Sequence, residues 1–70
     1  NNLNSINISF NNFIADEIQI YDAIGRLLYI KNIDNQNELI ITELQKNNQP
    51  IFIKMINKTN NEELSVKHIF

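Results

Sequence analysis

Cysteine and tryptophan are absent from this 70-residue sequence, and glycine, proline and histidine occur once each. Without cysteine the chain forms neither disulfides nor thiolate metal sites, so its hydrophobic core must hold it together alone. His68 has no second imidazole with which to bind a metal, and no serine on a strained turn stands out as a nucleophile. We therefore expect no enzyme activity, no catalytic residue, no metal site and no cofactor.

An excess of charge of one sign is also lacking. Six Lys and Arg residues against eight Asp and Glu residues give a net charge of −2, and the basic residues are scattered along the chain. Proteins bind nucleic acids through clustered basic residues, so this composition argues against a nucleic-acid partner. No apolar run reaches the ~18–20 residues of a membrane-spanning helix, so we expect no transmembrane segment.

The first residues are asparagines and do not have the pattern of a signal peptide, which is a basic stretch followed by an apolar one. We expect residues 1–70 to form a single domain, cut from a longer precursor. A domain of this size buries only about 60% of the surface of its unfolded chain, so we also expect its stability to be marginal.

The sequence is rich in isoleucine and asparagine, with fourteen of each, and this mixture of β-branched side chains and turn formers favours strands. Apolar residues alternate in most segments, no segment has a helical period, and turn formers recur roughly every ten residues, as in small sandwiches. We expect an all-β fold, a small antiparallel β-sandwich of about six to seven strands. The strand segments that we predict are residues 5–10, 18–22, 26–33, 38–44, 51–57 and 62–70.

Alternation also predicts which side chains face the core. In the first strand these are Ile6, Ile8 and Phe10, and we expect Phe13 and Ile14 to close the edge of the core.

In residues 38–44 two alternatives are open, Leu39 with Ile41 or Ile40 with Thr42, and we prefer the first. Residues 51–57 are apolar on both faces, which predicts a central strand covered on nearly both sides. In the last strand Leu64 and Val66 share one face, and His68 and Phe70 are candidates for the same face.

The centre of the sequence, residues 18–30, reads as a hairpin around the single glycine. Asp22 opens a type I turn, and Gly25 supplies the left-handed residue of a three-residue loop. We expect Gly25→Val to be the most disruptive change here. The expected pairs across this hairpin are Asp22 with Arg26, Tyr21 with Leu27, Ile20 with Leu28, Gln19 with Tyr29 and Ile18 with Ile30, which places Ile18, Ile20, Leu28 and Ile30 on the core face.

The order of these features resembles the type A C-terminal sorting domain of the type IX secretion system, over nearly the whole chain. In that family a segment Ile-Tyr-Asp-x-x-Gly followed by Lys or Arg precedes a strand that ends in Lys or Arg and a lysine-rich last strand. Pro50-Ile51-Phe52 stands here where the family has Gly-Ile-Tyr. The family's Tyr-Pro-Asn-Pro entry motif would lie near or before Asn1 and is absent, so the resemblance implies a secreted precursor and a domain truncated near its N-terminal edge. The residues that match the recognition and fold motif are Tyr21, Asp22, Gly25, Arg26, Lys54 and Lys67.

The resemblance implies an immunoglobulin-like β-sandwich at the end of a secreted or surface protein of a Bacteroidetes-type bacterium. Such a domain is an export signal, with or without anchoring of the cargo to surface lipopolysaccharide, and catalyses nothing. The partners implied are the type IX translocon, its outer-membrane shuttle barrel and a surface cysteine protease that removes the signal. The implied location is the periplasm in transit, and then the cell surface or the medium.

Each part of this interpretation has an alternative. The turn residues serve either the fold alone or a contacted epitope, and Lys54 and Lys67 are either contacts or solvated residues that guard the sheet against association. The alternative function is a β-sandwich spacer or a carbohydrate-contacting module of a surface adhesin or secreted enzyme. A sorting domain must end its precursor, which distinguishes the two functions.

Overall fold

The computed structural model describes residues 5–34, 36–44, 46 and 48–70, and over these residues it contains six β-strands and no helix. The predicted turn over residues 34–37 and the predicted loop over 45–49 each include residues outside this description. The all-β class and a count of six strands are confirmed for the described part of the chain. The strands are β1 (Ile6–Ser9), β2 (Glu17–Asp22), β3 (Leu27–Asn32), β4 (Glu38–Ile41), β5 (Pro50–Asn57) and β6 (Glu62–Ile69).

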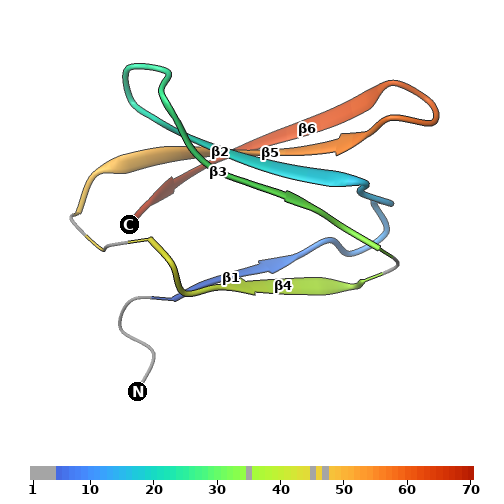
Figure 1. Ribbon diagram of the computed structural model, residues 1–70, viewed down its shortest axis with the longest axis horizontal. Helices are drawn as coiled ribbons and strands as arrows, with labels where there is room; N and C mark the ends of the chain where they lie inside the picture. The colour runs from blue at the N-terminus through green and yellow to red at the C-terminus, as the bar shows by residue number, and fades with distance from the viewer. Residues whose placement is uncertain (1–4, 35, 45, 47) are drawn as a thin grey trace.

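The strands form two antiparallel sheets (Figure 1). The small sheet pairs β1 with β4, and the large sheet has the strand order β3-β2-β5-β6. Two hairpins, β2 with β3 and β5 with β6, make up the large sheet, and Figure 1 shows both turns projecting away from the small sheet. β5 lies between β2 and β6, which confirms its predicted central position.

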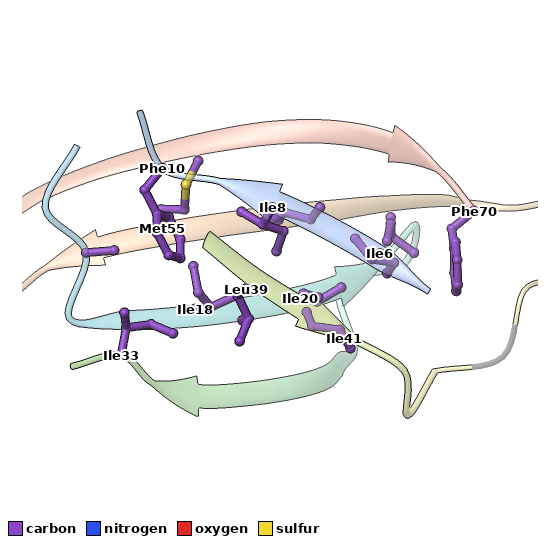
Figure 2. Packing of buried hydrophobic residues seen from close by; sticks show 13 residues of the cluster. Ile6, Ile8, Phe10, Ile18, Ile20, Ile33, Leu39, Ile41, Met55 and Phe70 are labelled. Carbon is purple, nitrogen blue, oxygen red and sulfur yellow. The ribbon is translucent and has the colours of Figure 1, made fainter. Parts of the chain in front are cut away.

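The buried side chains of both sheets form one hydrophobic cluster (Figure 2). In the small sheet Ile6 pairs with Ile41 and Ile8 pairs with Leu39, and all four side chains are buried. The predicted inward positions of β1 and the choice of Leu39 with Ile41 are therefore confirmed. The other buried apolar residues are Phe10, Ala15, Ile18, Ile20, Ile33, Ile51, Ile53, Met55 and Phe70.

The register of the β2–β3 hairpin differs from the prediction beyond its first pairs. Tyr21 pairs with Leu27 as expected, but Ile20 pairs with Tyr29, so Leu28 is an extra residue on β3. An extra residue of this kind is a β-bulge, and it shifts every following pair by one position. Gln19 therefore pairs with Ile30 and Ile18 pairs with Lys31.

The bulge changes which β3 side chains reach the core. Ile18 and Ile20 are fully buried as predicted, but Leu28 is 41% exposed and Ile30 is 53% exposed, so placing these two on the core face was wrong. Tyr29 packs against the core in their place. Because β3 begins with four consecutive apolar residues, its pattern does not specify a face, and a shift of one residue costs little apolar burial.

The face of the large sheet turned away from β1 and β4, here called the outer face, is largely open. Phe52 is 40% exposed, so the prediction that β5 is covered on nearly both sides was wrong. Six strands leave only the two-stranded sheet to cover the large one, and it covers a single face. Ile14 was also misplaced, because it is 72% exposed, whereas Phe13 packs against the core as expected.

Candidate recognition surface

The turn between β2 and β3 is built around the carboxylate of Asp22. Its Oδ1 accepts hydrogen bonds from the backbone N–H groups of Ile24 (3.1 Å) and Arg26 (2.9 Å), and its Oδ2 accepts one from Arg26 Nε (2.7 Å). The bond from the Arg26 backbone N–H is the main reason that the pKa of Asp22 lies below its ordinary value. The side chain of Asp22 thus fixes the backbone of the loop that follows it.

Backbone hydrogen bonds close the same turn. The N–H of Gly25 donates to the carbonyl of Asp22 at 3.1 Å, and the N–H of Asp22 donates to the carbonyl of Arg26 at 3.0 Å. Gly25 has a φ of 89°, in the left-handed region that only glycine enters at little cost. The predicted three-residue loop and the pairing of Asp22 with Arg26 are therefore confirmed.

The register brings the aromatic and basic motif residues together on the outer face. Tyr21 of β2 pairs with Phe52 of β5, and Phe52 pairs with Lys67 of β6, so these three side chains form one row across three strands. The Nζ of Lys54 lies 5.6 Å from the centre of the Tyr21 ring, which is cation–π distance. Phe52 is the member of this Tyr21–Phe52–Lys67 row that sequence reasoning missed as a site residue. The period-two pattern of residues 51–57 contained the signal.

A chain of polar contacts runs along β2 on the same face. The Tyr21 hydroxyl donates to Gln19 Oε1 at 2.5 Å, and Gln19 Nε2 donates to Glu17 Oε2. Glu17 Oε1 in turn forms an ion pair with Lys58 Nζ at 2.8 Å. Lys58 first, and Gln19 second, hold the pKa of Glu17 below its ordinary value, and Glu17 raises the pKa of Lys58. These contacts fix the Tyr21 ring in its position.

A hollow of about 460 Å³ lies at the same end of the molecule as the turn. Its lining includes Ile24 and Arg26 from the turn, Leu28 from the bulge, and Leu44 and Phe70. Figure 2 shows Phe70 at one end of the buried cluster. Leu28 and Phe70 therefore line the same hollow as the turn residues Ile24 and Arg26.

Within residues 5–34, 36–44, 46 and 48–70, no group of His, Asp and Glu side chains is arranged to hold a metal ion. His68 lies on β6 with its ring 6.3 Å from that of Phe70, in a stacked arrangement. Across the same residues no helix is long and apolar enough to cross a membrane.

The six predicted site residues lie in two adjoining groups. Asp22, Gly25 and Arg26 form the turn. Tyr21 precedes the turn directly and joins it to Lys54 and Lys67 on the outer face.

A family described as a domain of unknown function, DUF8694, matches residues 1–70 of the chain. Neither the curated proteins nor the solved structures contain a match.

Proposed function

We propose that this chain, which belongs to the DUF8694 family, is a C-terminal sorting domain that directs an attached cargo through a type IX secretion system. In this proposal the two sheets are an immunoglobulin-like β-sandwich whose surface is read by the translocon and its shuttle barrel. A surface cysteine protease then removes the domain. The cargo passes through the periplasm and ends at the cell surface or in the medium, and the domain has no catalytic role.

The observation that carries the proposal is the turn. The motif residues that gave the resemblance, Asp22, Gly25 and Arg26, form one hydrogen-bonded unit instead of being scattered over the surface. A turn with both its side-chain and its backbone donors satisfied keeps one shape, and a fixed shape is what a signal recognised in folded form requires.

The outer face adds aromatic and basic side chains to this signal. Lys67 is exposed at the end of the Tyr21–Phe52–Lys67 row, and Lys54 lies over the Tyr21 ring in the adjoining row. An aromatic and basic surface of this kind suits a partner with apolar and acidic groups, because aromatic residues supply contact area and lysines supply charge complementarity.

A cargo fusion tests the proposal. Residues 1–70 with their native upstream linker are fused to a fluorescent protein that is targeted to the periplasm of a host with a type IX system. We expect fluorescence at the cell surface or in the medium. Retention in the periplasm, in a strain that exports a fusion to a known sorting domain, would contradict the proposal.

Matched variants separate recognition from folding. Lys67→Ala on the outer face should weaken export and leave the thermal melt unchanged, whereas Lys31→Ala on the edge strand β3 should leave both unchanged. Ile20→Asp should abolish export by unfolding the domain, because it buries a carboxylate at a fully buried position. Equal export of the Lys67→Ala and Lys31→Ala fusions would remove Lys67 from the recognition surface.

A further inference from the structure

We propose that the free edge of β6 pairs with the β6 edge of a second copy of this chain, giving a two-fold symmetric dimer with one continuous eight-stranded sheet. This inference is independent of the proposed function and rests on the residue order of β6. β6 ends the large sheet, and no strand among the described residues pairs with its other edge. It is eight residues long, and all eight are exposed.

The hydrogen bonds near the end of β6 show which of its backbone groups are free for a partner. The Phe70 N–H donates to the Gln49 carbonyl, and the Phe70 carbonyl accepts the Asn48 N–H, so both Phe70 groups point toward β5. Backbone groups alternate in direction along a strand, and β6 pairs with β5 without a register shift. The N–H and C=O groups of Glu63, Ser65 and Lys67 therefore point to the free edge.

The same residues set the symmetry of the pairing. In an antiparallel pair centred on Ser65, the two Ser65 residues face each other, and Glu63 of each copy faces Lys67 of the other. All three are among the residues whose backbone groups point outward, so the register forms about six backbone hydrogen bonds. Their side chains lie on the outer face, because the two residues between them, Leu64 and Val66, pair with the buried Met55 and Ile53.

The opposite face of the strand matches in the same register. Leu64 of each copy faces Val66 of the other, and these side chains are 46% and 44% exposed in one chain. They form non-hydrogen-bonded pairs, in which side chains approach most closely. Dimerisation therefore covers two apolar residues per chain that the small sheet leaves exposed. Glu62 faces His68 at the ends of the pairing.

Antiparallel β6–β6 pairings centred on other residues do not bring Glu63 of one copy opposite Lys67 of the other. An axis at Leu64 or Val66 places Glu63 and Lys67 opposite uncharged residues. An axis two residues from Ser65 places Glu63 opposite Glu63, or Lys67 opposite Lys67, which destabilises a strand pair. All of these registers place the outer faces of both copies on the same side of the joined sheet. Among them, the charges of Glu63 and Lys67 favour the one centred on Ser65.

The other edge of the large sheet lacks such a match. β3 carries the bulge at Leu28, and bulges disrupt pairing with a further strand. A pairing centred on Ile30, at the middle of β3, places Leu28 opposite Asn32 and Tyr29 opposite Lys31. No opposite charges meet there, so β6 is the edge that we assign to self-association.

Sedimentation equilibrium of the 70-residue chain over roughly a hundredfold concentration range tests the dimer. We expect the mass to rise from monomer to dimer with concentration. Glu63→Lys and Lys67→Glu should each weaken the dimer about tenfold or more, because each puts two like-charged pairs at the interface. A mass of one chain at every concentration would overturn the proposal and leave the edge to a strand of another protein.

Variants with exchanged charges at positions 63 and 67 test the register itself. Within one chain, Lys54 Nζ lies 3.6 Å from Glu63 Oε1, and every Glu63→Lys variant loses this ion pair. The double variant Glu63→Lys with Lys67→Glu should therefore dimerise more tightly than either single variant, and an equimolar mixture of the two single variants should form a heterodimer. The Lys31→Glu variant, with the same charge change on β3, is the control and should dimerise normally. Circular dichroism confirms that each variant is folded. A double variant that is folded but monomeric, or single variants that dimerise as well as the original chain, would refute the Ser65-centred register.

Discussion

The bulge at Leu28 makes a quantitative prediction, because it decides whether Ile30 or Tyr29 of β3 faces the core, whereas Ile20 of β2 faces the core in either register. Ile20 is fully buried and Ile30 is 53% exposed. Truncating a fully buried isoleucine to alanine costs about 2–5 kcal/mol of the free energy of unfolding. A 70-residue domain has only ~3.5–10 kcal/mol in total, so Ile20→Ala is expected to remove about half of the stability.

The milder exchange to valine keeps the comparison measurable. Ile20→Val should cost about 0.5–1.5 kcal/mol, and a loss of 1 kcal/mol lowers the melting temperature of a domain of this size by roughly 4–8 °C. Ile30→Val should change the free energy of unfolding by less than about 0.5 kcal/mol, as exposed substitutions do. Urea unfolding followed by far-ultraviolet circular dichroism measures both values, since the chain has no tryptophan.

Deletion of Leu28 provides a second measurement. Tyr21 would still pair with Leu27, and Ile20 with Tyr29, so removing the extra residue leaves a regular hairpin with the same core face. We expect this deletion to cost less than Ile20→Ala. An Ile30→Val variant as unstable as Ile20→Val, or a Leu28 deletion that unfolds the chain, would refute the bulged register.

Three further predictions concern the turn and the charged contacts. Gly25→Ala should cost about 1–2 kcal/mol in urea unfolding, from its positive φ alone, since nothing lies within 4 Å of the added Cβ, and Gly25→Asn should cost less. In the same assay Asp22→Ala should destabilise more than Asp22→Asn, which keeps an oxygen for the backbone donors of the turn. The lowered pKa of Glu17 stabilises the fold above the ordinary value of 4.5, and this contribution is lost as the pH falls through the folded-state pKa. Lys58→Gln should therefore flatten the fall in unfolding free energy between pH 7 and about 3.

The turn could be predicted from the sequence because its determinants are local. An Asp side chain that accepts backbone donors and a glycine that supplies a positive φ specify the loop without any help from the rest of the fold. The alternation in β1 was equally decisive, because Ile6 and Ile8 have polar neighbours that can only face water. Where local chemistry or a strict period decides, the sequence predicts the structure.

The register of β3 could not be predicted because its determinants are not local. Leu27, Leu28, Tyr29 and Ile30 are all apolar, so either face of the strand is acceptable to the core. The chosen register pairs Tyr29 with Ile20 and continues to Ile33, whose N–H donates to the Asp16 carbonyl at 2.8 Å. These are tertiary interactions.

The open outer face could not be predicted for the same reason, because it too depends on tertiary structure. The pattern of β5 shows that Phe52 and Ile56 alternate with core residues, but not whether a second layer covers them. Coverage depends on how many strands the chain can provide for the other sheet. The row that joins Tyr21, Phe52 and Lys67 follows from pairing three strands, so its members could be suspected from the sequence but not assembled.

Lys67 belongs to both proposals, and the charge-swapped chain separates them. If the export machinery reads a positive charge at position 67, the Glu63→Lys and Lys67→Glu double variant should dimerise in solution but fail to restore export of the fluorescent fusion. If it instead reads the dimer, export should follow dimerisation through every variant, and the double variant should be exported better than either single variant. Export of all variants regardless of their mass would show that neither the charge at position 67 nor the β6 edge is read. The signal would then lie in the turn, where Asp22 and Gly25 fix the backbone.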